Sequence, residues 1–344
     1  MDPHWQQILL TAGGRFADGE LLHFGHPEAE LSAALHTEVC TDLSHLGLIE
    51  VIGNDAGTFL HALLTIDVHA IGDGQSGIGA WCTAKGQVVT VLRVVHTGDR
   101  YLLLLPADLT DTVLRRLQLY VLRREVTLED RRAALCRMGI AGAGLAPLFD
   151  AEHLPLPSAE GHAAQEDGLI TIRLVGQPPR AIVLAEGEIL QGLWQRLSRR
   201  VAPVTPQAWI MLDILAGVPW LNRSSSEKYL PQMLNLQCLG GVSFNKGCYP
   251  GQEVIARLKY RGQLKRRLHL ALAETRALAE PGSAVYDDTD AIGEVLFASP
   301  HPEGAVLLAV LPLAYGEQGD IFLHHPGGMA LRLQDLPYAL TEMS

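Results

Sequence analysis

The sequence predicts an α+β protein whose last quarter is a small all-β unit. Up to about residue 217, segments with helical spacing of apolar residues alternate with short β-prone runs. From Leu268 onward, short apolar runs are separated by Gly, Asp and Pro, without helical periodicity. The chain has 344 residues, 48% of them hydrophobic and 19% charged, which is a globular composition with room for two or three domains. We therefore divide it into a mixed α/β region, 1–267, and a C-terminal β domain, 268–344.

The first predicted element is a strand from Leu48 to Ile52. Gly53-Asn54-Asp55 supplies turn and N-cap residues, and a helix follows in which apolar side chains recur at helical spacing. The stretch from Gly79 to Pro106 then predicts strands joined by turns at Lys85-Gly86 and Gly98-Asp99.

Three further helices are predicted. The first, in "ADLTDTVLRRLQLYVLRREVTLED", is capped near Asp108 or Thr110 and leads into a strand at Glu125 to Leu128. After a loop with poor periodicity from Ala141 to Gly168, "EGEILQGLWQRLSRRV" and "TPQAWIMLDILAGVPW" each predict a helix. In the last one Thr205 is the cap, Pro206 lies in the first turn and Gly217 ends the helix.

Composition and cysteine content indicate a cytoplasmic protein without disulfides. We find no apolar run of the roughly 18 residues that a membrane span needs, and no signal peptide at the start. The number of cysteines is odd and no CxxC pair occurs, so we expect free thiols and no zinc-finger type of metal site. The five are Cys40, Cys82, Cys136, Cys238 and Cys248.

One segment departs from the acidic character of the chain, whose formal net charge is −11. No acid occurs from Val254 to Ala273, and six basic residues do. This basic strip either docks an anionic partner, an acidic protein or RNA, or is simply a solvated strand and turn. Its members are Arg257, Lys259, Arg261, Lys265, Arg266 and Arg267.

Cys248 is the sharpest candidate for chemistry. Glycines at positions 247 and 251 allow unusual backbone conformations and close approach to a ligand. Lys246 lies two residues away, and a nearby cation lowers the pKa of a thiol and favours the reactive thiolate. The alternative is an inert thiol, because cysteine is among the most buried residue types.

Three other residues have a functional and a structural interpretation. Lys85 either presents its ammonium group to an anion or belongs to an ordinary hairpin turn. Asp67 either lines a polar site or caps a helix or turn. Trp209 lies on the apolar stripe of its helix, so it is either a core side chain or a ring that stacks on a flat heterocycle. No Walker loop and no strand followed by GxGxxG is present, which leaves nucleotide binding of those kinds unsupported.

Together these segments resemble the YgfZ family, a bacterial folate-binding group tied to tRNA modification and iron–sulfur enzymes. Its signature K-G-C-Y-x-G-Q-E is matched in full by Lys246 to Glu253. The resemblance runs from about Leu43 to Ala314 and includes a helix ending in T-x-D-V, a strand and turn, L-R-x-x-V and G-x-P. These pieces are Leu60 to Val68, Trp81 to Gly86, Leu122 to Val126 and Gly217 to Pro219.

The family shares its fold with the glycine-cleavage T-protein, a tetrahydrofolate-dependent aminomethyltransferase. The resemblance implies two interleaved α/β domains and a C-terminal β-barrel arranged as a ring, with folate in a central channel. It implies a functional thiol at Cys248, assisted by Lys246. It also implies that Glu253 and Arg257 hold the motif loop in place, and that Leu46 replaces a tryptophan of the family. The residues expected to bind the cofactor are Trp209, Asp67, Lys85, Tyr249, Glu253 and Arg257.

Two functions stay open at this point. In T-proteins, paired aspartates follow the turn that matches Gly86, whereas Gln87 to Val91 contain no carboxylate here, and Leu215 replaces a glutamate. A carboxylate orients or deprotonates the amine donor, so its absence favours a tetrahydrofolate-binding accessory protein for iron–sulfur enzymes, including those that modify tRNA. The alternative is a folate-dependent one-carbon transferase or demethylase. The expected partners are folate, iron–sulfur or tRNA-modifying enzymes, and RNA through the strip from Arg257 to Arg267, with no membrane.

Overall fold

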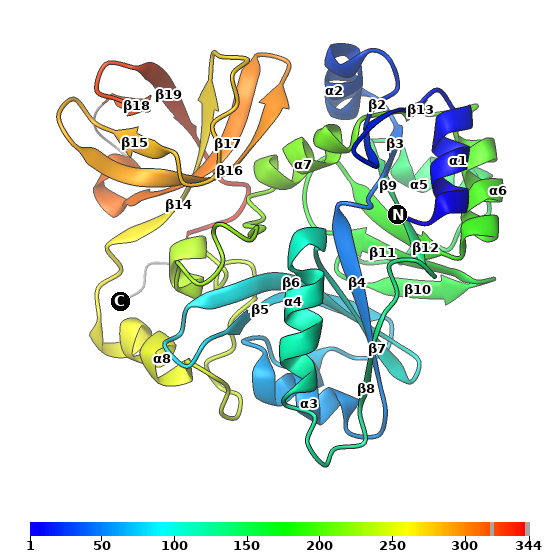
Figure 1. The fold of residues 1–344 in the computed structure, drawn as a ribbon, viewed down its shortest axis with the longest axis horizontal. Coiled ribbons are helices and arrows are strands. Elements are labelled where there is room, and N and C mark those ends of the chain that lie inside the picture. Colours follow the sequence, from blue (N-terminus) through cyan, green and yellow to red (C-terminus); the bar gives the residue numbers. More distant parts are fainter. Residues whose placement is uncertain (317–319, 341–344) are drawn as a thin grey trace. The chain divides into compact units, whose positions relative to one another are not determined.

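The computed structural model describes residues 1–316 and 320–340 (Figure 1). The chain forms two compact units, each built from three segments. Unit 1 consists of 1–56, 71–77 and 93–212, and unit 2 consists of 57–70, 78–92 and 213–344. Of the predicted C-terminal domain, 268–344, residues 317–319 and 341–344 lie outside the described residues.

The core of unit 1 lies between a mainly antiparallel sheet and helices that come from early and late segments of its sequence. The sheet has the order β10-β11-β12-β9-β3-β13, in which only the short β13 pairs in parallel. Trp5, Trp194 and Phe149 are buried in this core, where the two indole rings meet edge to face at 5.5 Å. The strands are β3 (Val39–Asp42), β9 (Cys136–Ala141), β10 (Ala163–Glu166), β11 (Leu169–Leu174), β12 (Arg180–Ala185) and β13 (Ala202–Pro203). The helices are α1 (Pro3–Thr11), α2 (Pro27–His36), α5 (Leu145–Ala151) and α6 (Gly187–Leu197), and a hairpin is formed by β1 (Arg15–Ala17) and β2 (Glu20–His23).

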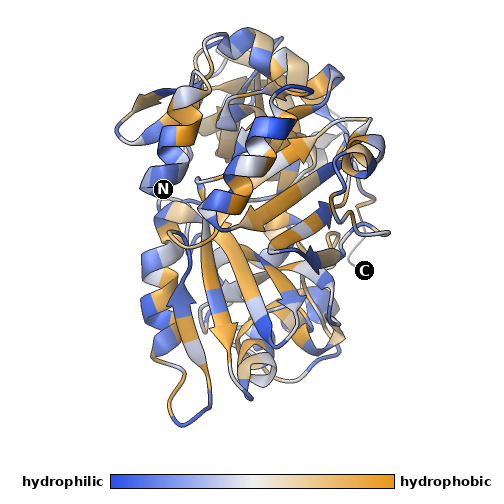
Figure 2. Cartoon of the chain, turned by 90° about the vertical axis from the view of Figure 1, so that its right-hand side faces the viewer, coloured by the Kyte–Doolittle hydropathy of each residue, from blue (hydrophilic) through white to orange (hydrophobic). Residues whose placement is uncertain are grey.

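A second sheet has the order β5-β6-β7-β4-β8. The chain passes from one unit to the other within β5 and β6, at residues 77–78 and 92–93. Helix α4 packs on β4, where Gly47 leaves room for the Thr110 hydroxyl. Figure 2 shows that the strands carry mostly hydrophobic residues, whereas the helices carry both kinds. The elements are β4 (Leu46–Ile52), β5 (Gln75–Cys82), β6 (Val88–Thr97), β7 (Arg100–Pro106), α4 (Ala107–Gln118) and β8 (Thr127–Asp130).

Unit 2 ends in a closed six-stranded β-barrel, which confirms the predicted all-β tail. Strand β14 pairs with β17 on one side and with β19 on the other, and this closes the barrel. Its interior is filled by small and branched side chains such as Ala271, Leu307 and Ala309. The order is β14 (Arg266–Ala273), β17 (Gly304–Pro312), β16 (Ala291–His301), β15 (Ala284–Tyr286), β18 (Ile321–Leu323) and β19 (Met329–Gln334). The other elements are α3 (Ala56–Leu63), α7 (Pro206–Leu215), which begins in unit 1, α8 (Gln252–Arg261) and the 3₁₀ turns η1 (Val68–Ala70), η2 (Pro231–Leu234) and η3 (Leu313–Gly316).

Several predicted boundaries are wrong. Helix α4 begins at Ala107 with Pro106 as its N-cap, so neither Asp108 nor Thr110 caps it, and the strand after it is Thr127–Asp130. The predicted loop 141–168 contains α5 and β10, two elements too short to show a period. The basic strip is not a strand and turn at its start, because Arg257, Lys259 and Arg261 lie on helix α8.

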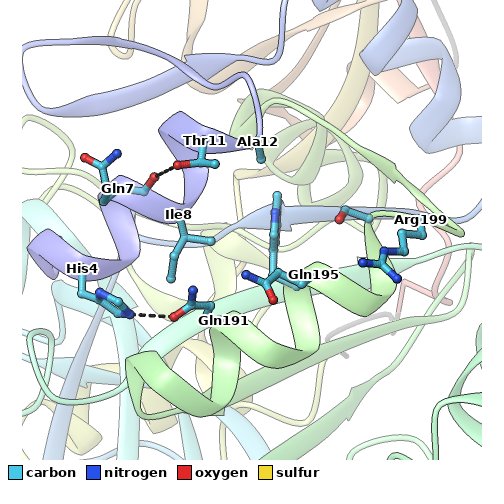
Figure 3. Close-up of a pocket in the computed structure, with 10 residues that line it drawn as sticks. His4, Gln7, Ile8, Thr11, Ala12, Gln191, Gln195 and Arg199 are labelled. Carbon is cyan, nitrogen blue, oxygen red and sulfur yellow. Dashed lines mark hydrogen bonds between the residues drawn. The ribbon is translucent and has the colours of Figure 1, made fainter.

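A surface pocket of about 280 Å³ lies between helices α1 and α6 in unit 1 (Figure 3). His4 Nε2 lies 2.8 Å from Gln191 Oε1 at one end, and Arg199 lines the other end. None of the residues that the sequence predicts as functional lines it. Among the described residues, no helix is long and apolar enough to cross a membrane.

Trp209 packs against a strand position that admits no side chain, and this contact gives a test of the fold. A Cβ on Gly139 would lie 2.5 Å from Trp209 Cε3 and Cζ3. We expect Gly139→Ala to lower the free energy of unfolding by about 1–3 kcal/mol, because the core would be overpacked. In α6, a Cβ on Gly192 would meet only the Arg196 guanidinium, at 3.9 Å. Gly192→Ala should therefore be neutral or stabilise by about 0.5–1 kcal/mol. Urea unfolding followed by circular dichroism measures both, and equal effects would contradict the contact.

Candidate functional site

The K-G-C-Y-x-G-Q-E motif forms a loop, 246–251, that leads into helix α8. Two other parts of unit 2 hold this motif loop from opposite ends. The segment after helix α3, residues 61–68, receives Lys246, and the turn 83–87 between β5 and β6 receives Gly251. These are the matched T-x-D-V and K-G pieces of the sequence, so three segments far apart in the chain meet here.

Lys246 anchors the start of the loop. Its ammonium group donates hydrogen bonds to the carbonyl oxygens of His61, of Leu64 at 2.6 Å and of Ile66 at 2.9 Å. These carbonyls lie at the C-terminal end of α3, where the helix dipole favours a cation. Burial lowers the pKa of Lys246 to about 8, against the attraction of Asp67, so the group is mainly charged at pH 7. All three ammonium hydrogens are therefore used in holding the loop.

Gly251 fixes the other end of the loop by backbone-to-backbone contact. Its φ is 82°, and a Cβ there would lie 2.5 Å from the Gly86 Cα and 2.6 Å from the Thr83 carbonyl oxygen. Gly86 also has a positive φ, 77°, and sits against the Gly251 carbonyl oxygen. Glycine is needed at position 251 because the two main chains approach closer there than a Cβ allows, and it is favoured at position 86 by the positive φ.

The residues at the centre of the loop differ in exposure. Cys248 is a free and exposed thiol. Tyr249 is 6% exposed, its ring centre lies 5.1 Å from the Lys246 ammonium nitrogen, and burial raises the pKa of its hydroxyl. That hydroxyl is buried and has no hydrogen-bond partner in the described part of the chain. An orphaned hydroxyl is costly unless a ligand or a water molecule meets it.

Next to the loop lies a histidine pair that the sequence analysis missed. His61 Nδ1 is 3.1 Å from Asp67 Oδ1, and its ring stacks on His69 at 4.2 Å. Burial, Lys246 and His69 lower the pKa of His61, so the ring is neutral at pH 7. The Nε2 atom of the same ring lies next to the motif loop, since a Cβ on Gly247 would be 3.8 Å from it. In the sequence, the available signal for this pair was the spacing of His61 and His69 from Asp67, which is six and two residues.

Asp67 has a second task in the same turn. Its Oδ1 accepts the backbone N–H groups of His69 at 3.1 Å and Ala70 at 3.3 Å, which caps η1. The capping interpretation from sequence is therefore confirmed, and the same carboxylate also orients His61.

The remaining predicted residues of unit 2 are exposed. Lys85 lies in the turn 83–87, and Glu253 and Arg257 lie one helical turn apart on α8. Glu253 is in the first turn of α8, where the helix dipole favours an acid. Within residues 1–316 and 320–340 no three His, Cys, Asp or Glu side chains gather as a metal site.

Part of the basic strip is engaged locally. The Lys259 ammonium nitrogen lies 3.8 Å from the centre of the Phe244 ring, and Phe244 meets Tyr260 edge to face. Arg266 and Arg267 begin the barrel strand β14. The strip is thus spread over a helix, a linker and a strand.

Trp209 is the one predicted residue that belongs to unit 1. It is 1% exposed, packed on Gly139, and the Arg180 guanidinium carbon lies 5.2 Å from its ring centre. These contacts are those of a core tryptophan, the first of the two interpretations of this residue. Its role in cofactor binding stays a prediction.

The chain is similar over most of its length to curated bacterial proteins. It is 31% identical over 310 residues to the tRNA-modifying protein YgfZ of Escherichia coli (strain SMS-3-5 / SECEC), covering 87% of this chain and 93% of that protein. The chain belongs to the YgfZ family. YgfZ of Pectobacterium atrosepticum is 31% identical over 306 residues, covering 87% and 91%.

Two further comparisons concern the fold of this YgfZ-family chain. The family model of the GCVT N-terminal domain matches residues 15–149. The crystal structure of glycine cleavage system aminomethyltransferase T from Bartonella henselae aligns with a TM-score of 0.81 at 17% identity, covering 98% of this chain and 97% of that one. The predicted T-protein-like fold is therefore confirmed.

The contact between Gly251 and Gly86 predicts an unequal response of two glycines. We expect Gly251→Ala to cost about 1–3 kcal/mol of unfolding free energy more than Gly240→Ala, because its Cβ would collide with backbone. Gly240 has a similar φ, 71°, but nothing lies within 4 Å of its Cβ position, so it reports the backbone strain alone. Urea titration of both variants gives the difference, and equal losses would show that the loop does not need the close approach.

The three hydrogen bonds of Lys246 predict a large effect of its removal. We expect Lys246→Met to lower the free energy of unfolding by about 2–4 kcal/mol, because buried carbonyls lose charged donors. Lys228→Met, at an exposed lysine, should change it by less than about 0.5 kcal/mol.

The lowered pKa of Lys246 adds a pH test with a definite sign. Between pH 8 and the unfolded value of 10.5, the unfolded chain holds a proton that the native chain has released. The unfolding free energy of the wild type should therefore rise with pH relative to Lys246→Met across this window. A stability difference that shrinks as the pH increases would contradict the assignment.

Proposed function

We propose that this protein binds tetrahydrofolate and supports tRNA modification as an accessory protein of iron–sulfur enzymes, through the thiol of Cys248. The observation that carries the proposal is the motif loop itself. Lys246 and Gly251 fix both ends of the loop, and Cys248 is left exposed between them. A side chain held out by such a scaffold is typical of a group that meets a partner, whereas structural thiols are buried.

The family and the fold support the folate and tRNA parts of the proposal. Relatives at about 30% identity are named tRNA-modifying protein, and the solved structure with the same fold is an aminomethyltransferase. We infer from these names the substrate class and the cofactor. The link to iron–sulfur enzymes rests on the resemblance of the motif to its family.

Residues around the loop suit a folate ligand chemically. Tyr249 offers a buried hydroxyl without a partner, as a polar group of a pterin would require. The exposed ammonium group of Lys85 suits the carboxylates of a glutamyl tail. We assign Asp67 and Arg257 to the polar surroundings and Glu253 to the stability of α8. Bound tetrahydrofolate would supply a one-carbon carrier.

The neighbours of Cys248 indicate how its thiol is controlled. Lys246 acts as a positioning residue, because its donors are all directed to backbone carbonyls. The neutral His61, whose Nδ1 lies 3.1 Å from Asp67 Oδ1, places a ring nitrogen beside the loop that carries the thiol.

The competing function is one-carbon transfer of the aminomethyltransferase type. The fold favours it, but residues 88–91 are buried strand positions without a carboxylate. We therefore expect binding of tetrahydrofolate without turnover of a methylamine donor.

Complementation tests the proposal directly. In a bacterial strain lacking its YgfZ protein, the wild-type chain should restore the activity of iron–sulfur tRNA-modifying enzymes, measured as modified nucleosides by mass spectrometry. Cys248→Ala should restore less than about a tenth of it, whereas Cys238→Ala, at a half-buried thiol, should restore it fully. Tetrahydrofolate binding by calorimetry should be similar in all three proteins.

Other results would change the conclusion. Full rescue by Cys248→Ala would show that the function does not need the thiol. Absence of tetrahydrofolate binding by the wild type would show that tetrahydrofolate is not the cofactor. Formation of methylene-tetrahydrofolate from a methylamine donor would establish the transferase instead.

A further inference from the structure

The connection between α4 and β8 in unit 1 presents apolar side chains to solvent. Among the large hydrophobic residues of the described chain, Leu122 and Leu119 are the most exposed, at 85% and 73%, and Tyr120 between them is 43% exposed. We call residues 119–124 the α4–β8 tip. Single exposed leucines are common, but two beside a tyrosine on one short loop form a patch typical of an interaction site.

The backbone of the tip holds Leu122 outward at a conformational cost. Its φ is 50°, in the left-handed region that leucine seldom adopts. Asparagine or glycine would suit this position better, so the fold gains nothing locally from a leucine here. A strained residue whose side chain packs on nothing is a reason to look for a partner outside the unit.

The tip is nevertheless held in one shape. Arg124 Nη1 donates to the Tyr120 carbonyl oxygen at 3.0 Å, and the Arg124 amide donates to the Val121 carbonyl at 3.0 Å. Below it, the Glu125 amide donates to Asp55 Oδ2 at 2.9 Å, and Asn54 Nδ2 donates to Glu125 Oε2 at 2.7 Å. A preformed loop loses little conformational entropy when it binds a partner.

The charge around the tip indicates the character of the partner. The chain carries a net charge of −11, yet no acid occurs from Thr112 to Arg124. Of the flanking acids, Asp111 pairs with Arg132, and Glu125 accepts a hydrogen bond from the neutral Asn54. Four arginines lie close in sequence to the apolar residues, two before them on α4 and two on the tip itself, and these are Arg115, Arg116, Arg123 and Arg124. The complement of this surface is acidic.

We propose that the α4–β8 tip is a docking site for another protein, on which acidic residues surround an apolar pocket. Tyr and Arg around a buried apolar centre are the residues that dominate protein interfaces. RNA would be read by stacking and by phosphate contacts, in which two leucines have no part. Binding to a lipid surface draws on a longer amphipathic segment than six residues provide. The proposal is independent of folate binding and of Cys248.

A defined probe tests the site on the full-length protein. Random peptides displayed on phage are selected against the wild type, and the enriched sequence is synthesised and measured by fluorescence anisotropy. We expect peptides with a large apolar residue flanked by Asp or Glu. Leu119→Asn and Leu122→Asn should each weaken the peptide about tenfold or more, and Arg123→Gln should reduce the salt dependence of its Kd. Leu10→Asn, at a residue of unit 1 that is 44% exposed, should leave the Kd unchanged.

The folding of the variants is checked in the same experiment. Since asparagine tolerates a positive φ, Leu122→Asn should keep or raise the melting temperature, so loss of binding cannot come from unfolding. The proposal is overturned if no acidic apolar peptide is enriched, or if its Kd is the same in both tip variants. It is also overturned if polyuridylate RNA or phosphatidylglycerol vesicles bind in a tip-dependent way and the peptide does not.

Discussion

The candidate site depends on one half-buried ammonium group. Lys246 brings the motif loop to the end of α3 by donating to the backbone carbonyl of His61 in its last turn and to those of Leu64 and Ile66 just after it. The acceptors are backbone carbonyls. The hydrogen bonds therefore do not use the side chains at positions 61, 64 and 66, and the loop is held by the main chain of this segment. The positions of Cys248 and Tyr249, and the approach of His61 to the loop, follow from this anchor. A lysine in such a motif can thus be essential without touching a substrate.

The residues of the site fall into two groups, those that set the geometry of the loop and those whose polar groups are left without contacts among the described residues. Groups that set the geometry, Lys246, Gly251 and Gly86, are used up in contacts with the main chain. Groups with free chemical capacity, the Cys248 thiol and the Tyr249 hydroxyl, lie between them. This separation lets the loop keep its shape while the thiol and the hydroxyl stay free of hydrogen bonds to the main chain in the part of the protein that is described. It also explains why the motif combines glycines, a lysine and an aromatic residue with a single cysteine.

Sequence alone predicted the mixed class of fold, the all-β tail and the motif, because each depends on local pattern, whereas the barrel was implied by the family resemblance. The apolar runs after Leu268 are short and separated by Gly, Asp and Pro, and the K-G-C-Y-x-G-Q-E signature is contiguous. It did not predict the role of Lys246, because the three carbonyls it meets are about 180 residues away and carbonyls leave no mark in a sequence. His61 was missed for the same reason, since its neighbour Gly247 is distant in the chain. The helix α8 was taken for a strand and turn because its arginines and lysines hide a narrow apolar face around the buried Ile255.

The order of segments along the chain has a consequence for how the protein is made. Unit 2 takes its first two pieces, 57–70 and 78–92, from early in the chain and the rest from residue 213 onward. During synthesis the carbonyls of α3 leave the ribosome long before Lys246, whose partner Leu64 precedes it by 182 positions. Those early pieces are made before their partners in unit 2, and they stay without these partners while the remaining segments of unit 1 are synthesised. The hydrogen bonds that define the loop therefore cannot form until more than two thirds of the chain has been made, and the motif acquires its shape only then.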